Sequence, residues 1–436
     1  SGVETPKLLF TTYTNALVSY SQSLLQSLLG ADAKLVVVRT ADSVARELAD
    51  LGGMWKAPTD SELKKLLVEC RTKMTFAGNA LQQRAQRQTI EKLGTDYLLE
   101  EILDVIDGRG LSSAAEYESA RRPGRDVPLN KTQRGAVWAA REAFHAALTA
   151  RKLVTWEDLR ARAAARAPTA AVPKYDGVIV DEAQDLSPTT LRMLAALSRS
   201  ANRVFFTADA NQSIYGASFR WQDVHADLKF QGRTGVLKAN YRSTREIGEA
   251  ANGYLAVGEI EDENVAQAFA KSGPLPAIRA VATTADEVRL LDRFVRSASK
   301  ELRLGMGACA ILVPSNDAGE RIASALQARK IPTAFMHGKD LDLKSKSVKV
   351  ITLKSAKGLE FPCVALAGFV DGSFPFMPPN ATDEERDEVL KRERRTMYVA
   401  MTRAMHSLLL VVPKDATSPL LTGFDTKAWN LGEVAT

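Results

Sequence analysis

Short apolar runs alternate with longer helical stretches in both halves of the chain. Eight such runs share this pattern and lie at 7–14, 34–40, 177–182, 203–209, 308–315, 348–353, 363–369 and 407–412. Runs of this length that are rich in Val, Ile and Leu and separated by helical segments are typical of strands buried in parallel sheets. The pattern therefore predicts an α/β fold with two parallel sheets, and it predicts a helix at 15–29 directly after the first run.

The long interval between the second and the third run has a different pattern. From 41 to 172 the strand signals give way to helical segments rich in Ala, Arg, Leu and Gln, which are interrupted at Pro58, at 108–110 and at 123–124. A segment of this length with continuous helical patterning predicts a helical insertion and not a linker. We therefore expect three parts: a first α/β domain at 1–40 and 173–240, the helical insertion at 41–172, and a second α/β domain at 241–436.

Composition is typical of a multidomain protein. The chain has 436 residues and 45% hydrophobic residues, which is enough for several cores. No apolar stretch approaches the roughly 20 residues of a membrane span, and the first residues do not resemble a secretion signal, so we expect a cytoplasmic protein. Cys70, Cys309 and Cys363 lie far apart without a CxxC pair, which predicts buried free thiols and not disulfides or metal ligands.

The charge balance is mildly basic. The chain carries 58 Lys and Arg residues against 52 Asp and Glu residues, a net charge of +6. This excess permits a nucleic-acid partner without requiring one. Four scattered histidines give no metal cluster.

The segment GVIVDEAQD at 177–185 contains the clearest candidate chemistry. Its apolar run predicts a buried parallel strand, so Asp181 and Glu182 should lie at the carboxyl end of the sheet, where such sheets bind ligands. One carboxylate can hold Mg²⁺ while its neighbour polarises a water, as nucleotide hydrolysis requires. The alternative is a strand that leads into a capped helix at Ser187-Pro188. A cap does not require the further polar residues Gln184 and Asp185.

Other polar residues follow strands or helices in the same way. They are Asp209 and Gln212 after the strand at 203–209, Tyr241 and Arg242 in NYRST, Glu360 after a Gly turn, and Arg403 at a helix end. A Gln amide can contact a γ-phosphate or its attacking water, an aromatic ring can stack on a base, and Arg can bind phosphate with its fork. Each has a structural alternative taken singly: a core ring, a surface ion pair, a turn, or a cation that interacts with a helix dipole.

The order of these segments is more specific than any one of them. The series TTYTNAL, DEAQD, ADANQSIYG, NYRST, TLKSAKGLEF and YVAMTRA resembles the helicases of the UvrD/Rep family in superfamily 1, over nearly the whole chain. The resemblance implies two RecA-like motor domains, with ATP and Mg²⁺ bound between them. It also implies that arginines stabilise charge during phosphoryl transfer and make domain closure depend on ATP.

The resemblance also implies roles for single residues at the nucleotide site. Asp181 matches the Mg²⁺ carboxylate, Glu182 the general base, Gln212 the glutamine that contacts the γ-phosphate, Tyr241 the ring on adenine, Arg242 the neighbouring γ-phosphate arginine, Glu360 the ribose glutamate, and Arg403 the second arginine finger. Asp209, beside Gln212, and Gly358, in the turn before Glu360, belong to the same expected nucleotide site.

On the DNA side, the resemblance implies a groove that grips a single strand. The residues expected there are Thr12, Thr14, Asn15, Tyr215, Phe219 and Trp221 from the first domain, and Thr352, Lys354 and Ser355 from the second. Base stacking contributes about 1 to 3 kcal/mol per base and tolerates any sequence, which suits a translocase. Phe219 and Trp221 have the alternative of belonging to the core.

The chain also departs from the family pattern. It contains no GxxxxGK[ST] phosphate loop, whose amides and Lys would hold the β and γ phosphates. We expect that this loop was removed upstream of Ser1, and the alternative is a natural variant without it. Ala208 replaces the usual glycine, and Lys354 stands where histidine is usual. The short interval between NYRST and TLKSAKGLEF indicates that the second large insertion is missing. Duplex unwinding is therefore less strongly expected than translocation along a single strand.

The sequence thus predicts an ATP-dependent single-stranded DNA translocase or helicase of the UvrD/Rep type. Its expected substrate is single-stranded DNA or a duplex with a 3′ single-stranded tail, with 3′ to 5′ polarity by resemblance, in DNA repair or recombination. Hydrolysis by the chain without the loop should be impaired. The alternative from another class is a non-hydrolysing DNA-binding or scaffolding protein that retains the motor fold. A nuclease is less well supported because the sequence shows no credible metal-binding carboxylate cluster outside DEAQD.

Overall fold

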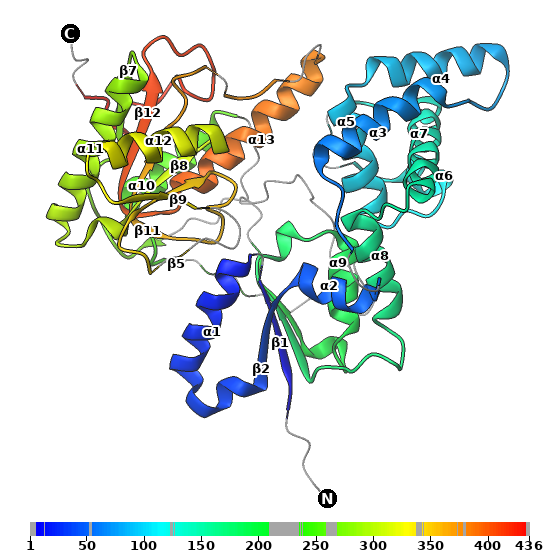
Figure 1. Cartoon of the computed structure of the whole chain (residues 1–436), viewed down its shortest axis with the longest axis horizontal. Helices are drawn as coiled ribbons and strands as arrows, with labels where there is room; N and C mark the ends of the chain where they lie inside the picture. The colour runs from blue at the N-terminus through cyan, green and yellow to red at the C-terminus, as the bar shows by residue number, and fades with distance from the viewer. Residues whose placement is uncertain are drawn as a thin grey trace, which may run out of the picture.

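The computed structural model contains two large parallel sheets, a small two-stranded sheet and a separate group of helices (Figure 1). It describes residues 6–12, 14–51, 55–122, 125, 127–208, 235, 237, 239–258, 268–336, 342, 344–372, 374–377 and 381–432. In Figure 1 the first sheet lies at the bottom, the helical group at the right and the second sheet at the upper left.

The first sheet has four parallel strands in the order β2-β1-β3-β4. The strands are β1 (Leu8–Thr12), β2 (Val36–Thr40), β3 (Gly177–Val180) and β4 (Val204–Phe206). The helices that accompany them are α1 (Asn15–Leu29), η1 (Gly30–Leu35), α2 (Ala41–Ala49), α8 (Trp156–Arg166), η3 (Ala183–Asp185), α9 (Pro188–Ala196) and η4 (Ala201–Arg203). All four strands end at the same edge of the sheet, because neighbouring strands run parallel.

The helical segments between β2 and β3 build a core of their own. They are α3 (Asp60–Lys73), α4 (Ala80–Lys92), α5 (Thr95–Glu100), η2 (Glu101–Asp107), α6 (Ala114–Ser119) and α7 (Lys131–Ala150). This core extends from Leu63 to Leu148, whereas α2 and α8 pack into the core of the first sheet. The boundaries at 41 and 172 stay a prediction, and the packing assigns α2 and α8 to the first sheet.

The second sheet has six parallel strands in the order β7-β12-β11-β8-β10-β9. Its strands are β7 (Ala277–Val281), β8 (Cys309–Val313), β9 (Thr333–Phe335), β10 (Val348–Thr352), β11 (Phe361–Leu366) and β12 (Ala404–Pro413). Its helices are α10 (Arg245–Ala256), α11 (Thr284–Glu301), η7 (Met306–Ala308), α12 (Asn316–Ala328) and α13 (Asp383–Met401). One face packs on α10 and α13 and the other on α11 and α12. A small sheet pairs β5 (Ala239–Asn240) with β6 (Ala268–Phe269).

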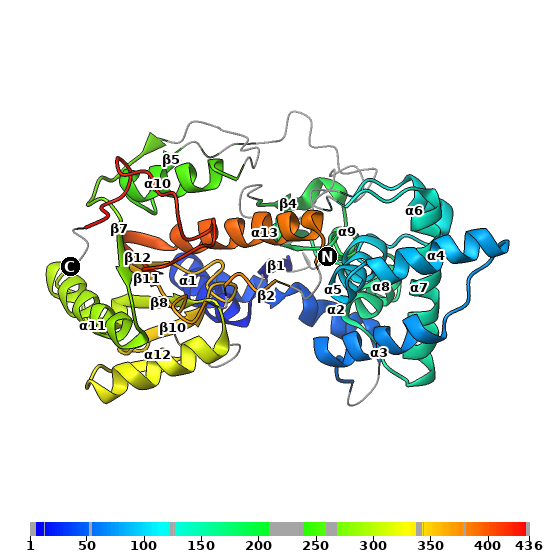
Figure 2. The same cartoon turned by 90° about the horizontal axis from the view of Figure 1, so that it is seen from above.

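These parts contact one another, and α1 and α13 contribute to the contacts. Leu17 of α1 is buried in the core of the second sheet, among residues of α10, β11 and α13. At the other side, the first half of α13 meets the helical group: the Gly94 amide donates to Glu385 at 3.1 Å and the Val127 amide donates to Glu388 at 3.1 Å. Figure 2 shows α13 lying between the second sheet and the helices of the insertion.

The predicted α/β fold with two parallel sheets is confirmed. The helix α1 has the expected bounds, because Thr14 caps its first turn and Gly30 ends it with a positive φ. The three cysteines are free and buried, as predicted. No helix in the described part of the chain combines the length and the apolar content that a bilayer span requires.

Candidate functional site

The two carboxylates of DEAQD follow β3 directly and are tied to the end of β4. Thr207 donates its hydroxyl to Asp181 Oδ1 at 2.5 Å and accepts from the Glu182 amide at 3.3 Å. Burial raises the pKa of Asp181 above its usual value and the charge of Glu182 adds to this, while the Thr207 hydrogen bond and the charge of Arg242 oppose it. The Asp181 carboxylate is therefore half-buried, fixed by its hydrogen bond to Thr207, and close to Arg242 of the second domain.

Glu182 has a backbone conformation that few non-glycine residues adopt. Its φ is 54°, in the left-handed region, and the turn η3 starts directly after it. Its carboxylate accepts a hydrogen bond from the Gln184 side chain, and its carbonyl accepts from the Asp185 amide at 3.0 Å. Strained backbone of this kind persists where the surroundings hold it, and it often marks a functional turn. The Gln184 hydrogen bond thus holds a carboxylate that starts from this uncommon backbone conformation.

Asp185, the last residue of DEAQD, is paired with the second domain. Its Oδ1 forms an ion pair with Lys357 Nζ, and the two side chains are 0% and 2% exposed. Burial raises the pKa of Asp185 to about 6, although the Lys357 ammonium opposes this. Asp185 Oδ2 is buried and has no hydrogen-bond partner. This pair joins the turn after β3 to the Gly turn that follows β10.

The second domain contributes the other residues that are expected to bind nucleotide. Arg242 Nε forms an ion pair with Glu360 Oε1, and both side chains are more than one third exposed. Tyr241 is 70% exposed, so its ring is open to solvent. Gly358 has a φ of 76°, and an added Cβ would meet Leu17 Cδ1 at 2.6 Å. The backbone conformation of Gly358 therefore favours glycine, and any side chain at this position would displace Leu17 of α1.

Arg403 occupies the short connection between α13 and β12, as the sequence predicts. Its guanidinium is fully buried, and its Nε donates to the Val399 carbonyl at 2.8 Å while its Nη2 donates to the Thr402 hydroxyl at 3.1 Å. It lies close enough to Asp185 for its charge to lower the pKa of that carboxyl. Arg403 thus contributes positive charge at the boundary between the two domains.

The residues expected on the DNA side fall into two groups. Thr12 is buried at the end of β1 with an unpaired Oγ1, and Thr14 Oγ1 accepts from the Leu17 amide at 3.3 Å. In the second domain, Thr352 donates its hydroxyl to Ser355 Oγ at 2.8 Å, and Lys354 between them is exposed. Thr352 and Ser355 therefore shape a turn that presents Lys354 to solvent. Both groups lie at the carboxyl ends of strands.

Several predicted residues lie outside the described part of the chain. They are Asp209, Gln212, Tyr215, Phe219 and Trp221, together with the side chain of Asn15. Their roles stay predictions.

Two residues of the site were missed by the analysis of the sequence. Thr207, which holds both Asp181 and the Glu182 amide, precedes Asp209 in RVFFTAD, and a hydroxyl at a strand end beside a carboxylate could have suggested it. Lys357 was considered only as part of a turn. Lys357 and its partner Asp185 are 172 positions apart in the chain, so no local sequence pattern predicts their contact.

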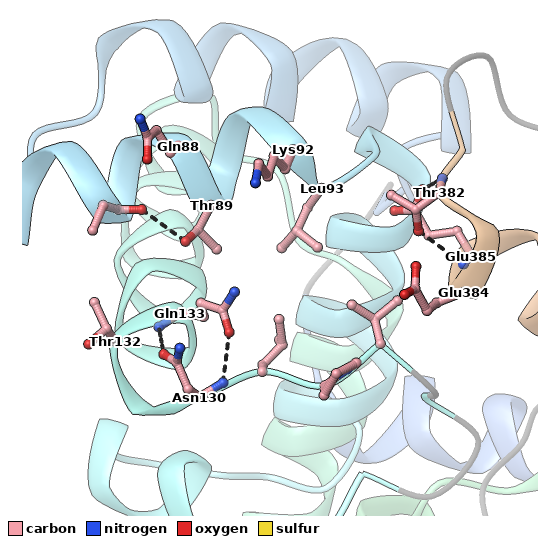
Figure 3. Close-up of a pocket in the computed structure, with 14 residues that line it drawn as sticks. Gln88, Thr89, Lys92, Leu93, Asn130, Thr132, Gln133, Thr382, Glu384 and Glu385 are labelled. Atoms are coloured by element: carbon pink, nitrogen blue, oxygen red, sulfur yellow. Dashed lines mark hydrogen bonds between the residues drawn. The ribbon is translucent and has the colours of Figure 1, made fainter.

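A pocket of about 560 Å³ lies away from these residues, between the helical insertion and the start of α13 (Figure 3). It is lined by Lys92 of α4, by Asn130 and Gln133 at the start of α7, and by Thr382 and Glu385 at the start of α13. Both helix starts are closed by their own capping boxes: Asn130 with Gln133, and Thr382 with Glu385. The polar groups at these helix ends are thus already paired within the chain.

Comparison with known proteins places these features in a family context. The family model described as the UvrD/REP helicase N-terminal domain matches residues 1–234, and the UvrD-like helicase C-terminal domain matches 236–341 and 336–415. Together the two models cover both sheets and the helical insertion.

Individual relatives agree with these family models. A probable DNA helicase from Mycoplasma pneumoniae is 28% identical over 239 residues, which cover 54% of this chain and 43% of the relative. DNA helicase IV from Escherichia coli is 25% identical over 312 residues, covering 68% of this chain and 41% of the relative. The chain thus spans less than half the length of these relatives. The C-terminal domain of a possible DNA helicase from Lactobacillus plantarum aligns with a TM-score of 0.33 and 22% identity, over 44% of this chain and 98% of that domain.

Proposed function

The chain belongs to the UvrD/Rep helicase family, and from this premise we propose that it is the motor of an ATP-dependent single-stranded DNA translocase or helicase. Its two parallel sheets correspond to two RecA-like domains, with the helical insertion in the first. ATP would bind between the domains, and its hydrolysis would alternately draw them together and release them.

One observation carries this proposal: carboxylates of the first domain meet cations of the second domain at one boundary. Asp185 pairs with Lys357, and the charges of Arg242 and Arg403 each act on a carboxyl of DEAQD. Phosphoryl transfer needs this combination, because carboxylates hold metal and orient water while arginines stabilise the charge that develops on the phosphate.

The residues at the end of β3 fit a role in ATP hydrolysis. Mg²⁺ would be held by Asp181 and would neutralise charge on the phosphate oxygens. The fit rests on a half-buried carboxylate whose second oxygen is not engaged by Thr207. Mg²⁺ in nucleotide sites uses one or two carboxylates together with phosphate and water, so one held carboxylate suffices. Glu182 would accept the proton of the attacking water.

The second domain would supply the remaining contacts to the nucleotide. Tyr241 offers an exposed ring for adenine, Arg242 a guanidinium for the γ-phosphate, and Glu360 a carboxylate for the ribose hydroxyls. Gln212 and Asp209 would approach from the first domain. Arg403 would contribute its charge when the domains are closed.

The proposed track for DNA runs over the strand ends of both sheets. Thr12, Thr14 and Asn15 would contribute from the first domain, and Thr352, Lys354 and Ser355 from the second, with Tyr215, Phe219 and Trp221 offering rings to bases. Exposed Lys354 suits a phosphate contact. The proposed polarity is 3′ to 5′ on a duplex with a 3′ single-stranded tail, and the proposed setting is DNA repair or recombination in the cytoplasm, where free buried thiols such as these three persist.

The experiment that tests this proposal measures ATP turnover and strand displacement. The protein encoded by the complete natural reading frame should hydrolyse ATP faster when single-stranded DNA is added, and it should displace a strand from a 3′-tailed duplex in preference to a 5′-tailed one. The 436 residues alone should bind single-stranded DNA with an affinity that falls as salt rises. Turnover that DNA does not stimulate would contradict the motor. Salt-sensitive binding without any turnover would favour the non-hydrolysing alternative.

A further inference from the structure

The buried pair of Asp185 and Lys357 offers an inference that goes beyond the family match. We infer that Lys357 is a positioning residue: through its ion pair with Asp185 it makes the orientation of Glu182 depend on closure of the second domain. The inference rests on the proposed function, because it concerns the same hydrolytic site.

The first step is the place of the pair at the domain boundary. Lys357 lies in the turn after β10, and Asp185 ends the turn η3 after β3. Both side chains are almost completely buried, at 2% and 0% exposed. Each of these two buried charges is stabilised by the other, since a buried charge without a partner is strongly unfavourable. Separation of the domains would break the pair and return both groups to water.

The second step is the connection from Asp185 to Glu182. The Asp185 amide donates to the Glu182 carbonyl at 3.0 Å, and the three residues between Glu182 and Leu186 form one short helical turn. Glu182 itself has a left-handed φ of 54°, which the surroundings must maintain. A displacement of Asp185 should therefore also move the backbone of Glu182, whose carboxylate is proposed to orient water.

The third step is the close packing around Lys357. Its neighbour Gly358 approaches Leu17 so closely that an added Cβ would clash, and Leu17 is buried in the core of the second domain. Asp185 Oδ2 is buried without a hydrogen-bond partner, so the negative charge on this oxygen is stabilised by nearby charges and not by a hydrogen bond. Lys357 and Arg403 from the second domain supply this stabilisation, and Glu182 from the first opposes it. The pair is thus sensitive to small displacements between the domains.

The test compares variants that remove charge with a matched control. Asp185→Asn removes one charge and keeps the shape of the side chain, and Lys357→Met removes the other charge and keeps an unbranched apolar chain of similar length. The control is Lys349→Met, because Lys349 is equally buried in the same domain, but its ammonium is held by the carbonyls of Gly307 and Ser345 at 2.6 and 2.8 Å. The control removes a buried ammonium of the second domain without breaking the pair between the domains.

Two readouts are needed. The first is DNA-stimulated ATP hydrolysis by the protein of the complete reading frame, with kcat and KM separated. The second is the inter-domain distance in the 436-residue chain, from energy transfer between dyes at Ala165→Cys on α8 and Glu320→Cys on α12, which are both exposed. The native cysteines are buried, so labelling goes to the introduced ones.

We expect each single variant to lower kcat for ATP hydrolysis by about tenfold or more, since Glu182 loses the orientation that domain closure gives it. The double variant should lose no more than either single one, because the two groups act as a unit. Both single variants should shift the distance between the two dyes toward longer values, whereas Lys349→Met should lower only the Tm. Unchanged kcat and distances in the single variants, or losses that multiply in the double variant, would overturn the inference. A wild type without turnover would instead contradict the proposed function, and the distances would still decide whether the pair holds closure.

Discussion

Arg242 and Glu360, which come from segments far apart in the chain, form an ion pair with each other at the edge of the second domain. Both were assigned to the same nucleotide, one to its γ-phosphate and the other to its ribose. Their side chains are 39% and 36% exposed, so water screens the pair and its contribution to stability is small, about 0 to 1 kcal/mol. A bound nucleotide can therefore replace the partner of Arg242 at little cost.

This relationship predicts different effects of removing each partner. Arg242→Ala should weaken the binding of a non-hydrolysable ATP analogue by about tenfold or more, because a charged bond to phosphate is lost. Glu360→Gln should change the affinity by less than about threefold, since the amide can still bond the ribose. Fluorescence titration with a labelled analogue measures both. Arg245→Ala serves as the control, because Arg245 is also exposed and pairs with the neighbouring Glu246. Equal affinities of Arg242→Ala and wild type would refute the phosphate role.

Gly358 and Leu17 predict a steric effect at the domain contact. Gly358→Ala should destabilise the protein by about 2 to 4 kcal/mol, because the left-handed φ is strained and the new methyl group meets Leu17. Gly372→Ala is a matched control: its φ is 72°, but nothing lies within 4 Å of its added Cβ, so it should lose about 1 kcal/mol. Thermal and urea unfolding measure the difference. In the Leu17→Ala background, the effect of Gly358→Ala should shrink toward that of the control, and an effect of unchanged size would argue against the contact.

His145 predicts a pH dependence of stability in the helical insertion. Its Nε2 lies 2.8 Å from Asp107 Oδ2, and its Nδ1 lies 3.6 Å from Asp158. Burial and the charge of Arg141 oppose protonation, but Asp107 and Asp158 outweigh them, so the pKa of His145 is raised above its usual value. A raised pKa in the folded state favours folding while His145 is protonated. This contribution is complete below the unfolded pKa of about 6.5 and is lost as pH rises through the folded pKa.

The measurement compares wild type with His145→Gln by urea unfolding at several pH values. The stability advantage of the wild type should be largest near pH ~5.5 and should shrink toward pH ~8.5. Asp107→Asn, which removes the main partner, should flatten the same dependence. An advantage that grows with pH would contradict the assignment.

Much of the fold could be predicted because it follows from local pattern. The helix α1 was predicted to its last residue, since Thr14 can cap it and Gly30 can end it. The strands β7 and β9 were not predicted: β7 pairs with only one neighbour strand and β9 has three residues, so neither carries a long buried apolar run. In the site, Asp181 and Glu182 were found because a strand ends on them. Lys357 was not, because its role depends on a partner from the other domain.

The catalytic role of Glu182 is tested most directly by the ATP turnover of Glu182→Gln in the protein of the complete reading frame, with Glu320→Gln on the exposed surface of α12 as control. Glu182→Gln should lower DNA-stimulated kcat by about a hundredfold or more while DNA affinity stays within about twofold, because only the proton acceptor is lost. The control should match the wild type. Turnover by Glu182→Gln at the rate of the wild type would contradict the claim that the carboxylates after β3 perform the chemistry.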